Sequence, residues 1–173
     1  MALDTYMLVA SQYVDEKDAL ADYDAVKQLY RDLDVIDTYD AAVMTKDGSG
    51  KVRIVKRVEE PTRHGAAGGL AVGLAVGALV ALFPAVAIGA GLAVGGAAGA
   101  AIGATAGHVA RGMSRKDLME VGELLDSGTS GLVVLAATDV ADRVAAAIGR
   151  GKDVLEKQVQ LDADGLKADI DTL

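Results

Sequence analysis

Residues 131–161 read GLVVLAATDVADRVAAAIGRGKDVLEKQVQL, and this stretch decides the fold class. It opens with the apolar run 132–137, which is typical of a strand buried on both faces. Thr138 or Asp139 then offers a helix N-cap, and 154–161 offers a closing strand. The helix between them carries three apolar residues on one face: Val140, Val144 and Ile148. The stretch therefore predicts a strand, a helix and a second strand of a mixed α/β domain.

The first sixty residues predict the other half of this domain. The apolar run at 6–10 indicates a strand, and the segments 38–45 and 51–58 indicate a hairpin around a glycine turn. Between them lies an amphipathic helix with apolar residues at helical spacing: Leu20, Tyr23, Val26 or Lys27, Tyr30 and Leu33. We expect its acidic residues to form a solvated face: Asp15, Glu16, Asp18, Asp22 and Asp24.

A further helix is predicted over 115–126, with Ser114 as its N-cap. Its inward residues are expected to be Leu118, Val121, Leu124 and Leu125. The order of elements predicts an α+β fold, a ferredoxin-like split βαββαβ domain with an inserted glycine-zipper helical hairpin. The predicted boundaries are 1–60 for the first half, 61–112 for the hairpin and 113–173 for the second half with a C-terminal extension.

The inserted segment is free of charge, because no Asp, Glu, Lys or Arg occurs from His64 through Ala110. We expect two helical arms that join near Phe83-Pro84, since proline is tolerated in the first turn of a helix. Nine glycines recur at a spacing of four within the arms, and they are the predicted helix-packing and oligomerisation residues: Gly65, Gly69, Gly73, Gly77, Gly91, Gly95, Gly99, Gly103 and Gly107. Such a stripe lets a second helix approach closely.

The expected partners of the hairpin are further copies of the chain and a lipid bilayer. Each arm is near the length of about 20 residues that spans a bilayer. Basic residues at both ends of the hairpin, among them Arg63 and Arg111, place the α/β domain in the cytoplasm by the positive-inside rule. The alternatives are a soluble cytoplasmic homo-oligomer (a cage, shell or filament with the hairpins buried between subunits) and a membrane-permeabilising protein.

Several classes of function are disfavoured. The net charge of −8 lies in two acidic flanks without a basic face, so nucleic-acid binding is not expected. The chain has no Cys, and its two histidines, His64 and His108, lack neighbouring carboxylates for a metal site. The glycine runs lack the Lys-Ser/Thr ending of a phosphate-binding loop. We therefore predict a non-enzymatic protein without catalytic residues, cofactor, metal or small-molecule substrate.

The order of segments resembles a bacterial family called domain of unknown function 1269, described as predicted membrane proteins. The resemblance rests on the early strand and acidic helix, the strand KVRIVKRVEEPT at 51–62, the glycine-rich apolar stretch, and residues 131–161. It spans most of the chain. It implies a membrane-linked, stress-associated role without an established activity, and it provides no functional residues to carry over.

Overall fold

The computed structural model describes residues 4–33, 39–46, 52–57 and 115–161. The elements in chain order are β1 (Asp4–Tyr13), α1 (Glu16–Asp32), β2 (Tyr39–Lys46), β3 (Val52–Arg57), α5 (Arg115–Ser127), β4 (Ser130–Ala136), α6 (Ala141–Ala147) and β5 (Val154–Leu161). Each of these agrees in type with the element that the sequence predicts there. The predicted hairpin at 61–112 and the tail at 162–173 lie outside the described residues.

The five strands form one antiparallel sheet in the order β3-β2-β4-β1-β5. β1 pairs with β4 on one side (Val9 opposite Val134) and with β5 on the other (Leu8 opposite Lys157). β2 lies between β4 and β3, and its pairing with β3 shifts register between Val43 and Met44. The mixed α/β class is thereby confirmed, although β4 comes between β1 and β2 in space and long after both in sequence.

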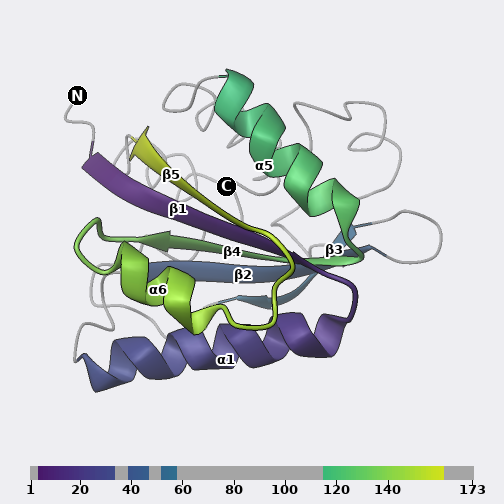
Figure 1. Ribbon diagram of the computed structural model, residues 1–173, viewed down its shortest axis with the longest axis horizontal. Coiled ribbons are helices and arrows are strands. Elements are labelled where there is room, and N and C mark those ends of the chain that lie inside the picture. Colours follow the sequence, from purple (N-terminus) through teal and green to yellow (C-terminus); the bar gives the residue numbers. More distant parts are fainter. Residues whose placement is uncertain (1–3, 34–38, 47–51, 58–114, 162–173) are drawn as a thin grey trace, which may run out of the picture.

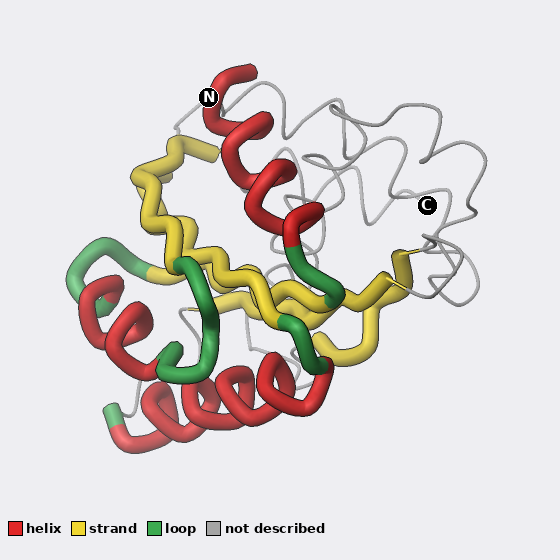
Figure 2. Tube along the Cα trace, turned by 45° about the vertical axis from the view of Figure 1, so that its right-hand side comes forward, coloured by secondary structure: helices red, strands yellow, loops and turns green. Residues whose placement is uncertain are grey.

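The helices lie on both faces of the sheet. α1 and α6 pack against each other and against one face, where α1 contacts β1, β2 and β4 (Figure 1). α5 packs on the opposite face, against β1 and β5, and Figure 2 shows it separated by the sheet from the other two helices. Within the described residues the strands form one open sheet, whose two edge strands are β3 and β5 (Figure 1).

The core between the sheet and the α1–α6 layer explains why this sequence folds as it does. Alternate residues of β1, β2 and β4 point into it, and α1 contributes Tyr23, Val26 and Tyr30, each at most 1% exposed. Burying side chains of this size contributes about 1.5–3 kcal/mol each to stability. β4 is buried along its whole length, as its uninterrupted apolar run predicts.

Helix α6 begins later than the sequence indicates. Thr138 or Asp139 is the expected cap, but the capping position is Val140, which makes no side-chain hydrogen bond there. The physical reason is a turn that closes first, with the Val140 N–H donating to the Ala137 carbonyl at 3.2 Å. Helix α1, in contrast, has a side-chain cap, because the Asp15 carboxylate accepts from the Lys17 N–H at 2.9 Å. Within the described ranges, no helix has the length and apolar character that crossing a membrane requires.

Candidate functional site

The most unusual polar residue of the domain is Asp22, in the middle of α1. The expectation that it belongs to a solvated acidic face is wrong, because it is 0% exposed. Its neighbour Asp24 is exposed as expected. The reason is helical position: Asp22 follows Ala19 by three residues and precedes Val26 by four, and both of these are buried. It therefore lies on the buried stripe of α1.

A buried carboxylate requires hydrogen-bond partners, and Asp22 has four. Its Oδ2 atom accepts from the Tyr13 hydroxyl at 3.0 Å, from the Arg150 backbone N–H at 2.8 Å and from the Gly151 N–H at 3.2 Å. Its Oδ1 atom accepts from the Arg150 guanidinium at 3.0 Å, which balances its charge. We call these residues (Asp22, Tyr13, Arg150 and Gly151) the Asp22 cluster.

The Asp22 cluster joins three segments that lie far apart in the sequence. Tyr13 ends β1, Asp22 lies in α1, and Arg150 and Gly151 lie in the loop between α6 and β5. Two further hydrogen bonds fix the same loop to Gln12. The Lys152 backbone N–H donates to the Gln12 carbonyl at 3.0 Å, and the Gln12 side-chain amide donates to the Asp153 carboxylate at 3.0 Å. The loop that starts β5 is consequently held at its backbone, and so is the position of β5 beside β1.

The Tyr13 hydroxyl acts in this cluster as a donor. Burial is the main reason that the pKa of Tyr13 is raised well above its usual value of 10.0, and the nearby Asp22 carboxylate raises it further. A phenol with such a pKa stays protonated at neutral pH and is unsuited to act as a base or nucleophile. The arrangement therefore has the chemistry of a structural clasp, in which a negative charge is fully satisfied by donors.

The close packing of the loop requires glycine at 151. A Cβ atom built there would overlap Ser11 Oγ, whereas a Cβ atom at Gly149 would meet nothing within 4 Å. Gly151 lets its N–H approach Asp22 while its α-carbon rests on β1. The glycines on either side of Arg150 thus have different roles in the loop.

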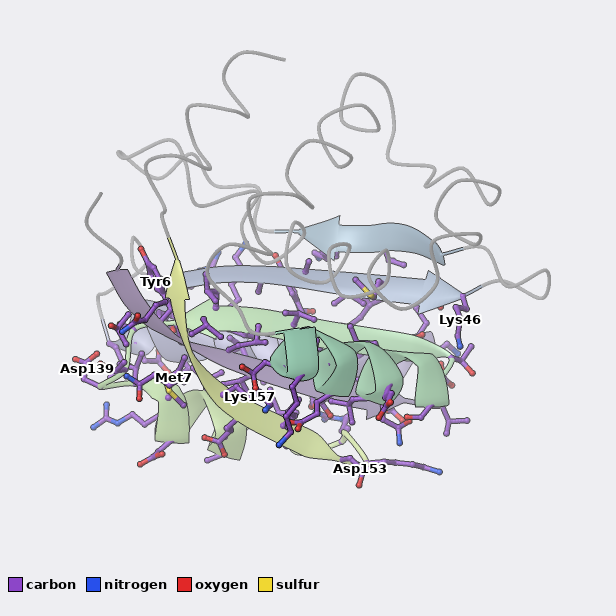
Figure 3. The ribbon with its side chains drawn as sticks, turned by 90° about the horizontal axis from the view of Figure 1, so that it is seen from above. Tyr6, Met7, Lys46, Asp139, Asp153 and Lys157 are labelled. Atoms are coloured by element: carbon purple, nitrogen blue, oxygen red, sulfur yellow. The ribbon has the colours of Figure 1, made fainter. Side chains whose placement is uncertain are left out.

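A second polar cluster fastens α5 to the opposite face of the sheet. Lys157 of β5 donates to Asp117 at 2.7 Å and forms an ion pair with Glu120, and both carboxylates belong to α5 (Figure 3). Hydrogen bonds to Asp117 and then to Glu120 raise the pKa of Lys157 above its usual 10.5. The lysine side chain is only 18% exposed, so this pair is worth more than a fully solvated one.

A third contact ties the edge strand β3 to α1. The Lys56 ammonium lies 5.6 Å from the centre of the Tyr23 ring and 3.9 Å from the Asp24 carboxylate. Both charged side chains are well exposed, so the ion pair contributes little, and the cation–π contact adds to the backbone pairing of β3 with β2.

The nine predicted packing glycines and both histidines lie outside the described residues. Within the ranges that the structure does describe, no group of three or more His, Asp or Glu side chains is close enough together to hold a metal ion. The Asp22 cluster is the feature that sequence reasoning missed. Its signal was an acidic residue on the buried stripe of α1 together with a Gly-Arg-Gly loop directly before a strand.

Comparison with known proteins places the chain in a family. Residues 66–169 match the family model described as "Protein of unknown function (DUF1269)". The match includes α5, β4, α6 and β5 but not β1, the strand that pairs with both β4 and β5. No curated protein and no solved structure matches the chain significantly. Because the matched range covers more than half of its 173 residues, the chain belongs to the DUF1269 family.

Proposed function

We propose that this protein is a non-enzymatic, membrane-associated protein that self-assembles through its glycine-rich segment. The observation that carries the proposal is the segment itself, which has no charged side chain from His64 through Ala110 and repeats glycine every fourth residue. In water, a glycine inside a helix costs about 0.5–1 kcal/mol relative to alanine. Nine glycines at a spacing of four are favourable only where helices pack closely, and such stripes are typical of helix pairs in membranes.

The place of this segment in the chain supports the proposal that the α/β domain holds it in a fixed position. It leaves from β3 at one edge of the sheet and returns at α5 on one face, and both elements are fastened to the core by the contacts of Lys56 and Lys157. Because the elements before and after the insertion are both attached to the core, the domain fixes the two points from which the insertion starts and ends. We infer that the α/β domain is a cytoplasmic platform for an apolar hairpin.

We also propose that the platform is ferredoxin-like. The elements β1, α1, β2, β4, α6 and β5 follow the order βαββαβ, and their strands lie in the order β5-β1-β4-β2, which this fold family uses. On this interpretation the insertion comprises β3, residues 58–114 and α5, so it begins one strand earlier than the sequence suggests. The fold carries no functional conclusion by itself.

A structural role is also supported by the chemistry of the Asp22 cluster. A catalytic carboxylate needs access to a substrate, whereas Asp22 is 0% exposed and accepts four hydrogen bonds from its own chain. Tyr13 is held protonated. The cluster fixes the loop before β5 and holds the carboxylate away from solvent.

Replacing Gly99 by leucine tests the assembly. The new side chain fills the glycine stripe, so we expect smaller particles than wild type in mild detergent by size-exclusion chromatography with light scattering. Ala101→Leu is the matched control, because in the proposed helix position 101 is about 200° around the axis from position 99. Unchanged particle size in Gly99→Leu, or an equal reduction in both variants, would show that the glycine faces do not hold the subunits together.

A further inference from the structure

The two edges of the sheet differ in how they are protected. Exposed edge strands offer unpaired backbone groups to other chains, and proteins usually guard them with charge, above all with lysine, or with irregular pairing. β3 fits this description: its sequence includes Arg53 and Arg57, and its pairing with β2 shifts register. β5 is longer and pairs with β1 over its whole length without such a shift.

The lysine that could guard β5 is withdrawn from the edge. Lys157 points to the α5 side, where Asp117 and Glu120 hold it, and Figure 3 shows it beside that helix. On the other face of β5 the side chains are exposed and carry one charge among four: Val154, Glu156, Gln158 and Gln160. Val154 is 41% exposed, which is unusual for a valine in this domain. Within the residues that the structure describes, β5 is thus a regular edge strand whose exposed face carries a single charge.

We propose that β5 pairs antiparallel with β5 of a second copy of this chain, so that two five-stranded sheets form one continuous sheet around a two-fold axis. An antiparallel pairing of identical strands is the symmetric arrangement in which one surface meets itself. Within the described residues, β1 is the strand that pairs with β5, on its inner side. This interface is distinct from the glycine faces and does not depend on them.

Charge selects the register of this pairing. A two-fold axis perpendicular to the sheet places residues of the same face opposite each other, and one residue faces its own copy. An axis at Glu156 or at Lys157 would put like charges directly opposite, which is destabilising. An axis at Gln158 puts amide opposite amide, Glu156 opposite Gln160 and Lys157 opposite Val159. Axes nearer to the ends of β5 pair fewer residues, so Gln158 is the favoured centre.

Disulfide trapping tests this register directly, because the chain contains no cysteine. In purified full-length Gln158→Cys under mild oxidation, we expect a covalent dimer on non-reducing gels. Residues directly opposite in antiparallel strands lie within disulfide range. It should form about tenfold or more faster than in Asp139→Cys, an exposed control on the loop before α6. Equal rates in the two variants would overturn the proposal.

A mixture provides the second arm. Glu156→Cys and Gln160→Cys should crosslink with each other when mixed, and each alone should not, because the two equivalent thiols lie about 14 Å apart at ~3.4 Å per residue. Strong crosslinking of Glu156→Cys alone would overturn the Gln158-centred register. The Gln158→Cys experiment is then repeated with Gly99→Leu. Persistence of the dimer separates this interface from the glycine faces, and its loss would overturn β5 as an independent interface.

Discussion

The carboxylate of Asp22 on α1 accepts a hydrogen bond of 2.8 Å from the backbone N–H of Arg150, which lies 128 residues later in the chain. The contact joins the N-terminal part of the protein, which the family match does not cover, to the loop that starts β5, which it does cover. A single buried charge thus connects the two halves of the domain across the insertion. Removing this charge should therefore lower the stability of the whole sheet.

Asp22→Ala is therefore expected to lower the free energy of unfolding by at least about 1–3 kcal/mol, because it leaves the Tyr13 hydroxyl and two backbone N–H groups without their acceptor. The Arg150 side chain is 53% exposed, so water can solvate its charge in the variant. Asp24→Ala is the matched control on the exposed side of the same helix, with an expected change within about 0.5 kcal/mol. Denaturant unfolding followed by circular dichroism measures both variants. Similar losses in the two would mean that the buried carboxylate has no special role.

Tyr13→Phe isolates the hydroxyl of the Asp22 cluster. The ring remains, but Asp22 loses one donor, and we expect a loss of about 1–3 kcal/mol at neutral pH. The raised pKa of Tyr13 also has a pH signature. The unfolded state releases this proton near 10.0 and the folded state retains it, so wild-type stability falls as pH rises above 10. Tyr13→Phe should show a shallower fall between about pH 10 and 11. Identical slopes would contradict the assignment.

Gly151→Ala should destabilise the protein, because its Cβ atom would overlap Ser11 Oγ and force the loop away from Asp22. A loss of about 1–3 kcal/mol is typical of such overpacking. Gly149→Ala meets nothing within 4 Å and serves as the control, with no loss expected. Thermal unfolding of both variants is the measurement. If only Gly151→Ala is destabilised, the requirement is one of packing at 151; if both are destabilised, the loop needs glycine for its flexibility and the packing argument is contradicted.

Lys157→Met should loosen the attachment of α5. The variant leaves Asp117 and Glu120 without their shared cation, with an expected cost of about 1 kcal/mol for a pair that is partly exposed. Hydrogen exchange should become faster in the first turns of α5 and stay unchanged in β4. Lys116→Met is the control, since Lys116 is 85% exposed and its nitrogen lies 3.8 Å from Glu120. Equal exchange in both variants would contradict a clasp at Lys157.

Local patterns in the sequence predicted the elements well, because they depend on periodicity within a few residues. The run 132–137 identified β4, and the segment 154–161 was correctly predicted as the closing strand, β5. The sheet order was less accessible, since the placement of β4 between β1 and β2 depends on contacts across the insertion. The cap of α6 was predicted at Thr138 or Asp139, but a preceding turn moves the start of the helix.

Asp22 shows why the polar site was missed. Counting apolar residues at helical spacing assigns every acid to the outer face, although Asp22 occupies a position on the buried stripe between Ala19 and Val26. Its partners are a hydroxyl and backbone N–H groups, which have no sequence signature of their own. The Gly-Arg-Gly loop offered a partial signal, because two glycines permit close approach of the backbone. A buried acid on one helix could not be matched with a distant loop from pattern alone.

Flotation on a density gradient, performed on a detergent-free lysate after an alkaline carbonate wash, tests the central claim most directly. A protein that is held in the bilayer by the segment from His64 through Ala110 resists the wash and rises with the lipid fraction, and this is the predicted result. If the protein instead remains at the bottom of the gradient as a lipid-free particle, the membrane association proposed for the chain is contradicted.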